Sequence, residues 1–278
     1  MSDTTITIGN VTVTSISDGY LTFAPADFFS TVPKEDWEPY KNLLTSDGTI
    51  IANMASFILR TPARTILVDT GMGVRPTPAP NSVSGLMLID MEAKGIRRDE
   101  VDMVVITHLH IDHVGWNLVH ENGEVRPTFA NASYWVPRSD WDHFTRLPDD
   151  SRPPYVDSQV IPLESLGCLN FMEGEQALTD ELTCVPTPGH TPGHTSFLLS
   201  SAGEQGIVLG DVAPSPAQVQ QTDWCPRVDI DPERSTASRT DIMERAEREG
   251  LLLLAGHFPA PSFGHVVRLQ GHRRWQPL

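Results

Sequence analysis

The stretch Thr107-His108-Leu109-His110-Ile111-Asp112-His113-Val114-Gly115 follows directly on an apolar run at 101–106, which predicts a buried strand. Three histidines and one aspartate stand between positions 108 and 113. Histidine is the commonest metal ligand in proteins, and a neighbouring carboxylate adds a hard oxygen donor. The alternative, a polar turn with incidental histidines, is a poor explanation of so many donors in one short loop. The stretch therefore predicts a metal site at the end of a strand.

Residue composition restricts the class of protein and its partners. The chain has 278 residues, of which 39% are hydrophobic and 20% charged, as in an ordinary globular protein with a large core. Its formal net charge of −16 argues against nucleic acid as a partner, because an acidic surface repels phosphate. The N-terminus lacks a signal-peptide pattern, the longest aliphatic run, Leu251–Leu254, is too short to cross a membrane, and the cysteines form no Cys-x-x-Cys pair. We expect a cytoplasmic protein that acts on a small-molecule substrate, with no nucleic acid or membrane partner.

The spacing of apolar residues predicts a succession of strands and helices. One helix is predicted over 82–94, where the spacing turns Leu86 and Ile89 toward the core. Met91 or Ala93 completes this inward face. The predicted strands are 6–8, 11–16, 54–59, 65–68, 101–106, 133–136, 182–185, 195–200, 206–209 and 251–255, and the other predicted helices are 114–120, one that opens at 139–142, and 232–248.

Two segments lack clear periodicity. Residues 148–166 are rich in proline and predict irregular structure. Residues 20–50 carry aromatic side chains among prolines and acidic residues. A long segment of this kind is often a lid or a dimer contact, and an ordinary surface excursion is an equally good interpretation. Both interpretations of residues 20–50 stay open.

Further metal-binding side chains stand at the ends of other predicted strands. His190 lies in a turn rich in proline and glycine after one strand, while Asp211 and His257 follow two others. Asp69 ends a fourth strand and is placed to hold a histidine ring in one tautomer. Strand ends along one edge of a layered sheet structure are where ligand sites collect, so we expect these residues to meet the histidine loop. For His194 we expect a packing or supporting role, and for His120, His143, His265 and His272 solvated or capping positions.

Taken together, these residues resemble the metallo-β-lactamase superfamily. The likeness covers residues 54–258 and follows the family's order: Asp69-Thr70-Gly71, His108-x-His110-x-Asp112-His113, then His190, Asp211 and His257. It implies an α/β fold in which two mixed β-sheets pack face to face with helices outside, an αβ/βα sandwich. It also implies a single domain over residues 1–278.

The same resemblance implies a site for two divalent metal ions. Zinc is the first choice for such mixed nitrogen and oxygen ligands, with manganese, cobalt or iron as alternatives. Asp69 would lie behind the ligands and support one of them. One ion takes His108, His110 and His190, the other takes Asp112, His113 and His257, and Asp211 bridges the two.

Two adjacent cations predict metal-assisted hydrolysis. They lower the pKa of a shared water toward neutrality, so that a bridging hydroxide becomes available to attack an ester, lactone or phosphotriester. Asp112 or Asp211 would carry the proton. No serine or cysteine stands in a convincing nucleophile context, so a covalent intermediate is not expected.

Within the superfamily, the chain resembles the branch of methyl parathion hydrolase and the N-acyl homoserine lactone lactonases. The likeness lies in residues 108–117, in Val228-Asp229-Ile230-Asp231-Pro232 and in Gly256-His257-Phe258-Pro259. Those lactonases carry a tyrosine three positions after the bridging aspartate, where it holds the substrate carbonyl, and here Pro214 stands at that position. This departure favours general ester, lactone or organophosphate hydrolysis. Quorum-signal lactonase activity and a mononuclear iron persulfide dioxygenase of the same fold are the alternatives.

Aromatic residues close to the predicted ligands are candidates for a substrate pocket. Trp116 and Phe258 lie within three positions of a predicted ligand, and Phe28 and Trp141 are further candidates. For each of these rings, ordinary core packing is the competing interpretation. By analogy with related enzymes, the expected assembly is a homodimer.

Overall fold

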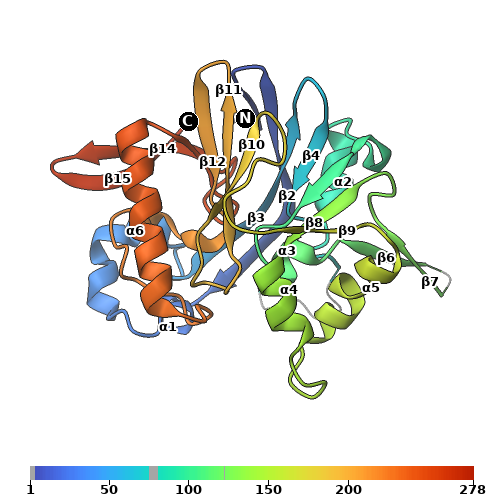
Figure 1. The fold of residues 1–278 in the computed structure, drawn as a ribbon. Coiled ribbons are helices and arrows are strands. Elements are labelled where there is room, and N and C mark those ends of the chain that lie inside the picture. Colours follow the sequence, from blue (N-terminus) through green and yellow to red (C-terminus); the bar gives the residue numbers. More distant parts are fainter. Residues whose placement is uncertain (1–3, 75–80, 122) are drawn as a thin grey trace.

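Two large β-sheets stacked against each other form the centre of the molecule, a computed structural model that describes residues 4–74, 81–121 and 123–278. Helices lie on the outer sides of both sheets (Figure 1). The α/β sandwich that the sequence predicts is thereby confirmed. None of the described helices is long and apolar enough to cross a membrane.

The first sheet has seven strands and changes from antiparallel to parallel pairing across its width. Its antiparallel half begins with the N-terminal hairpin, as the alternating sequence pattern predicts. Val104 and Val105, which precede the histidine loop, are fully buried, as expected for a parallel strand covered on both faces. In spatial order the strands are β1 (Thr5–Ile8), β2 (Val11–Phe23), β3 (Ile50–Arg60), β4 (Thr65–Val68), β5 (Met103–Val105), β8 (Ser133–Pro137) and β9 (Leu169–Met172).

The second sheet has six strands, and its only parallel pair among the described residues is β12 with β13. The strands predicted from the sequence do not include its last two strands, nor β9 in the first sheet. In spatial order the strands are β10 (Leu182–Pro186), β11 (Thr195–Ser201), β12 (Glu204–Val208), β13 (Leu252–Leu254), β14 (Phe263–Leu269) and β15 (His272–Pro277). A separate two-stranded sheet pairs β6 (Leu118–Glu121) with β7 (Glu124–Pro127).

Side chains from both sheets fill the space between them. Phe57 of β3 and Phe263 of β14 lie with ring centroids 5.9 Å apart in one buried cluster. On the outer face of the second sheet, Ile242 and Met243 of the long C-terminal helix pack against residues of that sheet in a separate buried cluster. The helices are α1 (Pro25–Phe28), η1 (Lys34–Leu43), α2 (Met87–Ala93), η2 (Arg98–Glu100), α3 (Ile111–Val114), α4 (Arg138–Thr145), η3 (Val156–Val160), α5 (Pro162–Ser165), η4 (Gly210–Val212), η5 (Pro216–Val219) and α6 (Pro232–Glu249).

The helix predicted over 82–94 begins five residues later than predicted and turns a different face inward. α2 buries Met87 and Met91, which lie four positions apart, whereas Leu86 and Ile89 are 39% and 66% exposed. The cause is a contact from a distant part of the sequence. Asp18 of β2 accepts a hydrogen bond of 2.7 Å from the backbone N–H of Met87 and fixes the first turn. The prediction that Leu86 and Ile89 face the core is therefore wrong.

No helix spans 114–120, contrary to the prediction. α3 lasts a single turn, and the chain then enters β6. Gly115 ends the helix because its backbone N–H donates to the carbonyl oxygen of Gly71 at 2.7 Å. A Cβ atom at this position would lie 2.1 Å from the backbone of Met72, so only glycine fits here. The apolar spacing carries no information about this long-range contact.

Residues 148–166 are more regular than their prolines predict. They contain one turn of π-helix, η3, followed by α5. Val156, Val160 and Leu163 are fully buried against the outer face of the first sheet. The prediction of irregular structure is wrong here, because burial of these apolar side chains orders the segment.

Residues 20–50 pack against the body of their own chain. Phe29, Trp37 and Tyr40 surround Trp224, with ring centroids 6.1, 4.9 and 5.4 Å from that ring. Aromatic pairs at these separations stabilise a contact beyond the area that they bury. The segment is thereby fixed beside the loop that follows η5.

Candidate metal centre

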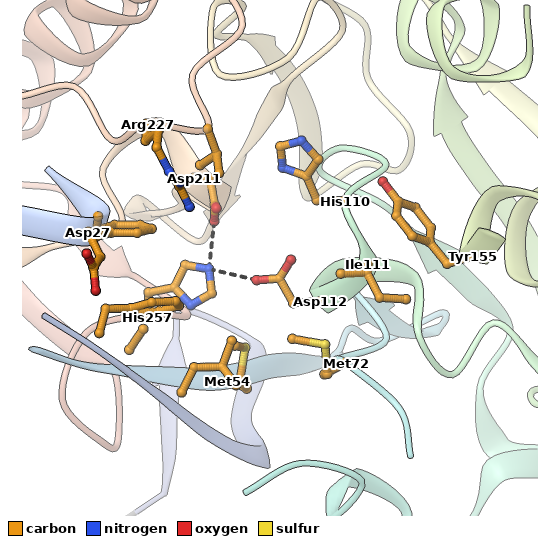
Figure 2. Close-up of a pocket in the computed structure, with 15 residues that line it drawn as sticks. Asp27, Met54, Met72, His110, Ile111, Asp112, Tyr155, Asp211, Arg227 and His257 are labelled. Atoms are coloured by element: carbon orange, nitrogen blue, oxygen red, sulfur yellow. Dashed lines mark ion pairs between the residues drawn. The ribbon is translucent and has the colours of Figure 1, made fainter. Parts of the chain in front are cut away.

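The residues predicted as metal ligands meet at one end of the two sheets. The histidine loop leaves the end of β5, and His190 lies in the loop between β10 and β11. Asp211 belongs to η4, directly after β12, and His257 follows β13. Figure 2 shows His110, Asp112, Asp211 and His257 facing one another across this site. Each segment reaches the site from a strand end, as the sequence predicts.

The nitrogen and oxygen atoms of these residues form two groups, and within each group the candidate ligand atoms lie within 4.8 Å of one another. Asp211 faces both groups. Its Oδ1 is 3.3 Å from His113 Nε2 and 3.0 Å from His257 Nε2, and its Oδ2 is 3.3 Å from His190 Nε2. A carboxylate that turns one oxygen to each group is suited to bridge two cations. The first group is His108, His110 and His190, and the second is Asp112, His113, Asp211 and His257.

Two rings of the second group are held by hydrogen bonds on the side away from the site. His257 Nδ1 lies 2.7 Å from the backbone carbonyl oxygen of Asn53, which only accepts, so Nδ1 carries the proton. His113 Nδ1 lies 2.8 Å from Asp69 Oδ2, and the N–H and hydroxyl of Thr107 donate to Asp69 at 2.8 and 2.9 Å. With the proton on Nδ1, each ring turns the Nε2 lone pair into the site, as metal-binding histidines require. This geometry fits the role expected of Asp69.

His190 of the first group is held by a buried chain of charges. Its Nδ1 lies 2.7 Å from Asp229 Oδ1, and Asp229 Oδ2 accepts from the guanidinium of Arg239 at 3.1 Å. Arg239 lies in α6, is fully buried, and donates to three backbone carbonyl oxygens as well. The sequence places Asp229 just before α6 but gives no sign that it contacts His190. Through Asp229 and Arg239, the His190 ring is held in a fixed orientation relative to α6, the longest helix described.

Atoms at the centre of the site lack the hydrogen bonds that burial requires. His113 Nε2 and Asp211 Oδ1 are buried and form none among the described residues. Leaving such an atom unsatisfied costs about 1–3 kcal/mol. In the first group, His110 Nδ1 lies 3.1 Å from His108 Nε2 and 3.0 Å from His190 Nε2, so three ring nitrogens converge on one point. A cation in each group satisfies these atoms, so the residues present fit a pair of divalent metal ions.

A buried carboxylate of α4 holds the two loops of the first group together. Asp140 Oδ2 accepts from the N–H of Leu109 at 3.0 Å and from the hydroxyl of Thr191 at 2.8 Å, and its Oδ1 accepts from the N–H of Gly193 at 2.6 Å. Burial raises the pKa of Asp140 above its ordinary value, although these hydrogen bonds act to lower it. No side chain caps the start of α4. Asp140 fixes the loop of His190 against the histidine loop instead.

Asp18 plays a corresponding part beside the second group. Its Oδ2 accepts from the N–H groups of Met72 and Gly73 at 2.7 and 2.9 Å, and its Oδ1 accepts from Trp116 Nε1 at 3.0 Å. Burial raises the pKa of Asp18 above its ordinary value. The pairing register of β2 with β3 shifts between Ser17 and Tyr20, around this residue. An Asp-Gly pair inside a strand of alternating apolar and hydroxyl side chains was the available sequence signal, and the prediction missed it.

His194 lies outside both groups and supports one of their members. Its Nε2 accepts a hydrogen bond of 2.8 Å from the backbone N–H of Asp211, and its Nδ1 lies 2.8 Å from the hydroxyl of Thr187. A buried ring in this position fixes the backbone that carries Asp211. The other histidines outside both groups are His120, His143, His265 and His272.

Burial and neighbouring charges push the histidine pKa values apart. Burial, with repulsion by His190, lowers the pKa of His110 to about 3. Burial also opposes the protonation of His190, but hydrogen bonds to Asp211 and Asp229 outweigh it and raise the pKa to about 9. For His113 too, nearby carboxylates, Asp211 foremost, outweigh burial and raise the pKa well above its ordinary value. Without metal the site therefore holds protons beside its carboxylates, and a metal ion has to displace them.

A cavity of about 330 Å³ opens onto both groups. Figure 2 shows candidate ligands in the lining of this cavity, with the apolar side chains of Met54, Met72 and Ile111 beside them. Part of its wall comes from residues 21–28, at the start of the segment without periodicity. Its lining consists of Leu21, Phe23, Asp27, Phe28, Ala52, Met54, Met72, His110, Ile111, Asp112, Tyr155, Asp211, Arg227, Val228 and His257.

Of the four aromatic residues predicted to contact substrate, only Phe28 lines this cavity. Trp116 donates its indole N–H to Asp18, as described above. Trp141 is buried in the core of the first sheet, and Phe258 is fully buried with its ring centroid 5.3 Å from that of Trp275. Substrate contact is therefore not expected from Trp116, Trp141 or Phe258. The sequence did not point to Tyr155, Arg227 or the apolar residues of β2 and β3 that line the cavity.

This chain belongs to the metallo-beta-lactamase superfamily, whose family model matches residues 54–257. Among curated relatives, an N-acyl homoserine lactonase of Bacillus thuringiensis is 26% identical over 221 residues, which cover 72% of this chain and 79% of the relative. A probable metallo-hydrolase of Bacillus subtilis is 24% identical over 212 residues, 70% of this chain and 76% of the relative.

Solved structures match nearly the whole length of the chain. AidC, described as a dizinc quorum-quenching lactonase in complex with a product, superposes with a TM-score of 0.84 at 21% identity, covering 99% of this chain and 96% of that one. AbOPH, described as a hydrolase in the beta lactamase superfamily, superposes with a TM-score of 0.84 at 23% identity and the same coverage. At these identities the likeness shows the fold, which extends beyond residues 54–257 at both ends.

Proposed function

We propose that this protein is a metal-dependent hydrolase that uses two divalent ions to open the ester bond of a small, largely neutral lactone. The observation that carries the proposal is the pair of facing ligand groups, with one carboxylate oxygen of Asp211 turned to each. The relatives named N-acyl homoserine lactonase support lactones as the substrate class. Other esters and phosphotriesters belong to the same proposal, because the same attack by water cleaves them.

The proposed metal ligands are His108, His110 and His190 for one ion, and Asp112, His113 and His257 for the other, with Asp211 between them. Bound ions supply a water of lowered pKa and polarise the substrate carbonyl. We propose zinc, since five imidazoles and two carboxylates shared between the two groups suit it, and manganese, cobalt and iron are the alternatives.

Asp112 is the better placed of the two proposed proton carriers. Its side chain lines the cavity and is 18% exposed, whereas that of Asp211 is 7% exposed and faces both ligand groups. An ionised carboxylate at the edge of the cavity can accept the proton of an attacking water and return it to the leaving oxygen. We therefore assign proton transfer to Asp112 and the bridging position to Asp211.

The cavity supports attack by water on an apolar substrate. Among the described residues that line it there is no serine, threonine or cysteine that could form a covalent intermediate. Leu21, Phe23 and Phe28 form an apolar wall that excludes solvent and suits an acyl chain. We propose that residues 21–28 act as this wall, and that the protein works as a cytoplasmic homodimer with one domain over residues 1–278.

A mononuclear iron persulfide dioxygenase needs only a subset of these ligands. It leaves no use for Asp112, His113 and His257, which face Asp211 as a complete second group. The test is a panel of lactones, aryl esters and phosphotriesters on enzyme reconstituted with zinc or manganese, with acid release followed in a pH-stat. We expect lactone turnover. Oxygen uptake with glutathione persulfide by iron-loaded protein, and no turnover of any ester, would sink the proposal.

A further inference from the structure

This chain lacks the tyrosine that the lactonases it resembles carry three positions after the bridging aspartate. Three residues after Asp211 stands Pro214, which is buried, has no side-chain donor and does not line the cavity. A lactone carbonyl gains negative charge as water attacks it, and hydrogen-bond donors aimed at that charge lower the barrier. If the chain opens lactones, a side chain elsewhere in the cavity can supply such a donor in addition to the metal ions that polarise the carbonyl.

Tyr155 does line the cavity. It is the residue that directly precedes η3. Its ring packs, partly buried, against the core of the first sheet. Figure 2 shows its hydroxyl turned toward His110 and the interior of the cavity. No described residue forms a hydrogen bond with this hydroxyl. A phenol held by its ring, with its O–H pointing at open space beside two ligand groups, is a donor without a protein acceptor.

The other groups in the cavity leave few alternatives. Apart from the candidate ligands, only Tyr155 and Arg227 among the described lining residues carry side-chain donors. Arg227 is exposed and lies on the side of Asp211 (Figure 2). Burial, with the charges of Asp112 and Asp140, raises the pKa of Tyr155 above its ordinary value, so the phenol keeps its proton at neutral pH.

We propose that Tyr155 donates a hydrogen bond to the carbonyl oxygen of the substrate and stabilises the negative charge that develops there during hydrolysis. The phenol keeps its proton, and no bond to Tyr155 forms or breaks. Tyr155 thus takes the part that Pro214 cannot, from a different element of the fold. This inference rests on the proposed function.

The test replaces Tyr155 by phenylalanine in full-length, metal-loaded enzyme, which keeps the ring and its packing. We expect kcat for a lactone to fall about 10- to 100-fold, with KM within about threefold, because the lost hydrogen bond forms mainly in the transition state. Metal content and Tm should not change. Tyr20→Phe is the matched control, since Tyr20 is 38% exposed on β2 and lies outside the cavity.

A substrate change separates a donor from a structural residue. In a thionolactone the carbonyl oxygen is sulfur, a much weaker acceptor, so Tyr155→Phe should reduce its turnover far less than that of the oxygen compound. Equal losses on both substrates, unchanged lactone turnover, or loss of metal or Tm in the variant would each overturn the inference. Wild-type enzyme that hydrolyses no member of the panel would instead overturn the proposed function, and the role of Tyr155 with it.

Discussion

Replacing Asp229 by asparagine should weaken metal binding at His190 without removing any proposed ligand. Asp229 Oδ1 lies 2.7 Å from His190 Nδ1, and its side chain is fully buried. Asparagine can still accept this hydrogen bond, so the tautomer of the ring survives, but the negative charge that makes the imidazole a stronger ligand is lost. Changes of this kind cost about 10- to 100-fold in metal affinity, or about 1.4–2.8 kcal/mol.

The same substitution should also destabilise the protein through Arg239. The guanidinium of Arg239 is 3.1 Å from Asp229 Oδ2, and neither side chain is exposed. Asparagine turns an N–H group toward that guanidinium, and a buried charge left without its partner costs about 3–5 kcal/mol. We therefore expect a lower free energy of unfolding for metal-free Asp229→Asn as well as weaker metal binding.

Two measurements separate these effects. Metal affinity is measured by competition with a chromophoric chelator, and unfolding by urea titration of the metal-free protein. Asp231→Ala is the control, since Asp231 caps α6 by accepting from the N–H of Arg234 at 3.1 Å and should cost about 0.5–2 kcal/mol of stability alone. Wild-type metal affinity in Asp229→Asn, or an equal loss of affinity in Asp231→Ala, would refute the reasoning.

Three further predictions concern the site and its cavity. The raised pKa of His190, about 9 against about 6.5 in an unfolded chain, means that its proton stabilises the metal-free fold below pH 6.5, and that this contribution is lost as pH rises through 9. Metal displaces that proton, so chelator competition should show zinc affinity rising about tenfold per pH unit up to pH 9; a flat profile from pH 7 to 9 contradicts this. Asp211→Asn should bind at most one metal ion tightly and lose at least about 100-fold in kcat, and two tightly bound ions by elemental analysis would count against a bridging carboxylate. Phe28→Ala should raise KM about fivefold for long-chain acyl lactones with little change in kcat, and a similar rise for lactones without a chain would remove Phe28 from the acyl wall.

The ligand set could be predicted from the sequence because each member carries a local signal. His108 to His113 form a dense motif, and His190, Asp211 and His257 each follow an apolar run that becomes a strand. Strand ends of a layered fold gather at common edges, so residues up to about 150 positions apart could be placed together without knowing the contacts between them.

The cavity could not be predicted in the same way, because its lining depends on which way each side chain turns in the finished fold. Phe258 is adjacent to His257 in sequence, yet its ring is fully buried beside Trp275 while His257 faces the cavity. Tyr155 lies in a proline-rich segment that the burial of its apolar neighbours helps to order. Neighbouring positions in a turn point in different directions, and sequence proximity to a ligand does not select among them.

The helix errors have the same origin. The helix expected at 114–120 is stopped by the contact of Gly115 with Gly71, and α2 is rotated by its hydrogen bond to Asp18. Gly71 and Asp18 lie in segments of the chain outside these helices. Hydrophobic periodicity within the helices therefore cannot predict the two contacts. Tertiary contacts of this kind override local propensity.

The most direct test of two metal ions acting at one site is a titration of metal-free protein with zinc while lactone hydrolysis is followed. The two groups of ligands around Asp211 predict that activity rises until two equivalents per chain are bound and then stays constant. Full activity at one equivalent, or binding of two equivalents without lactone turnover, would contradict the account.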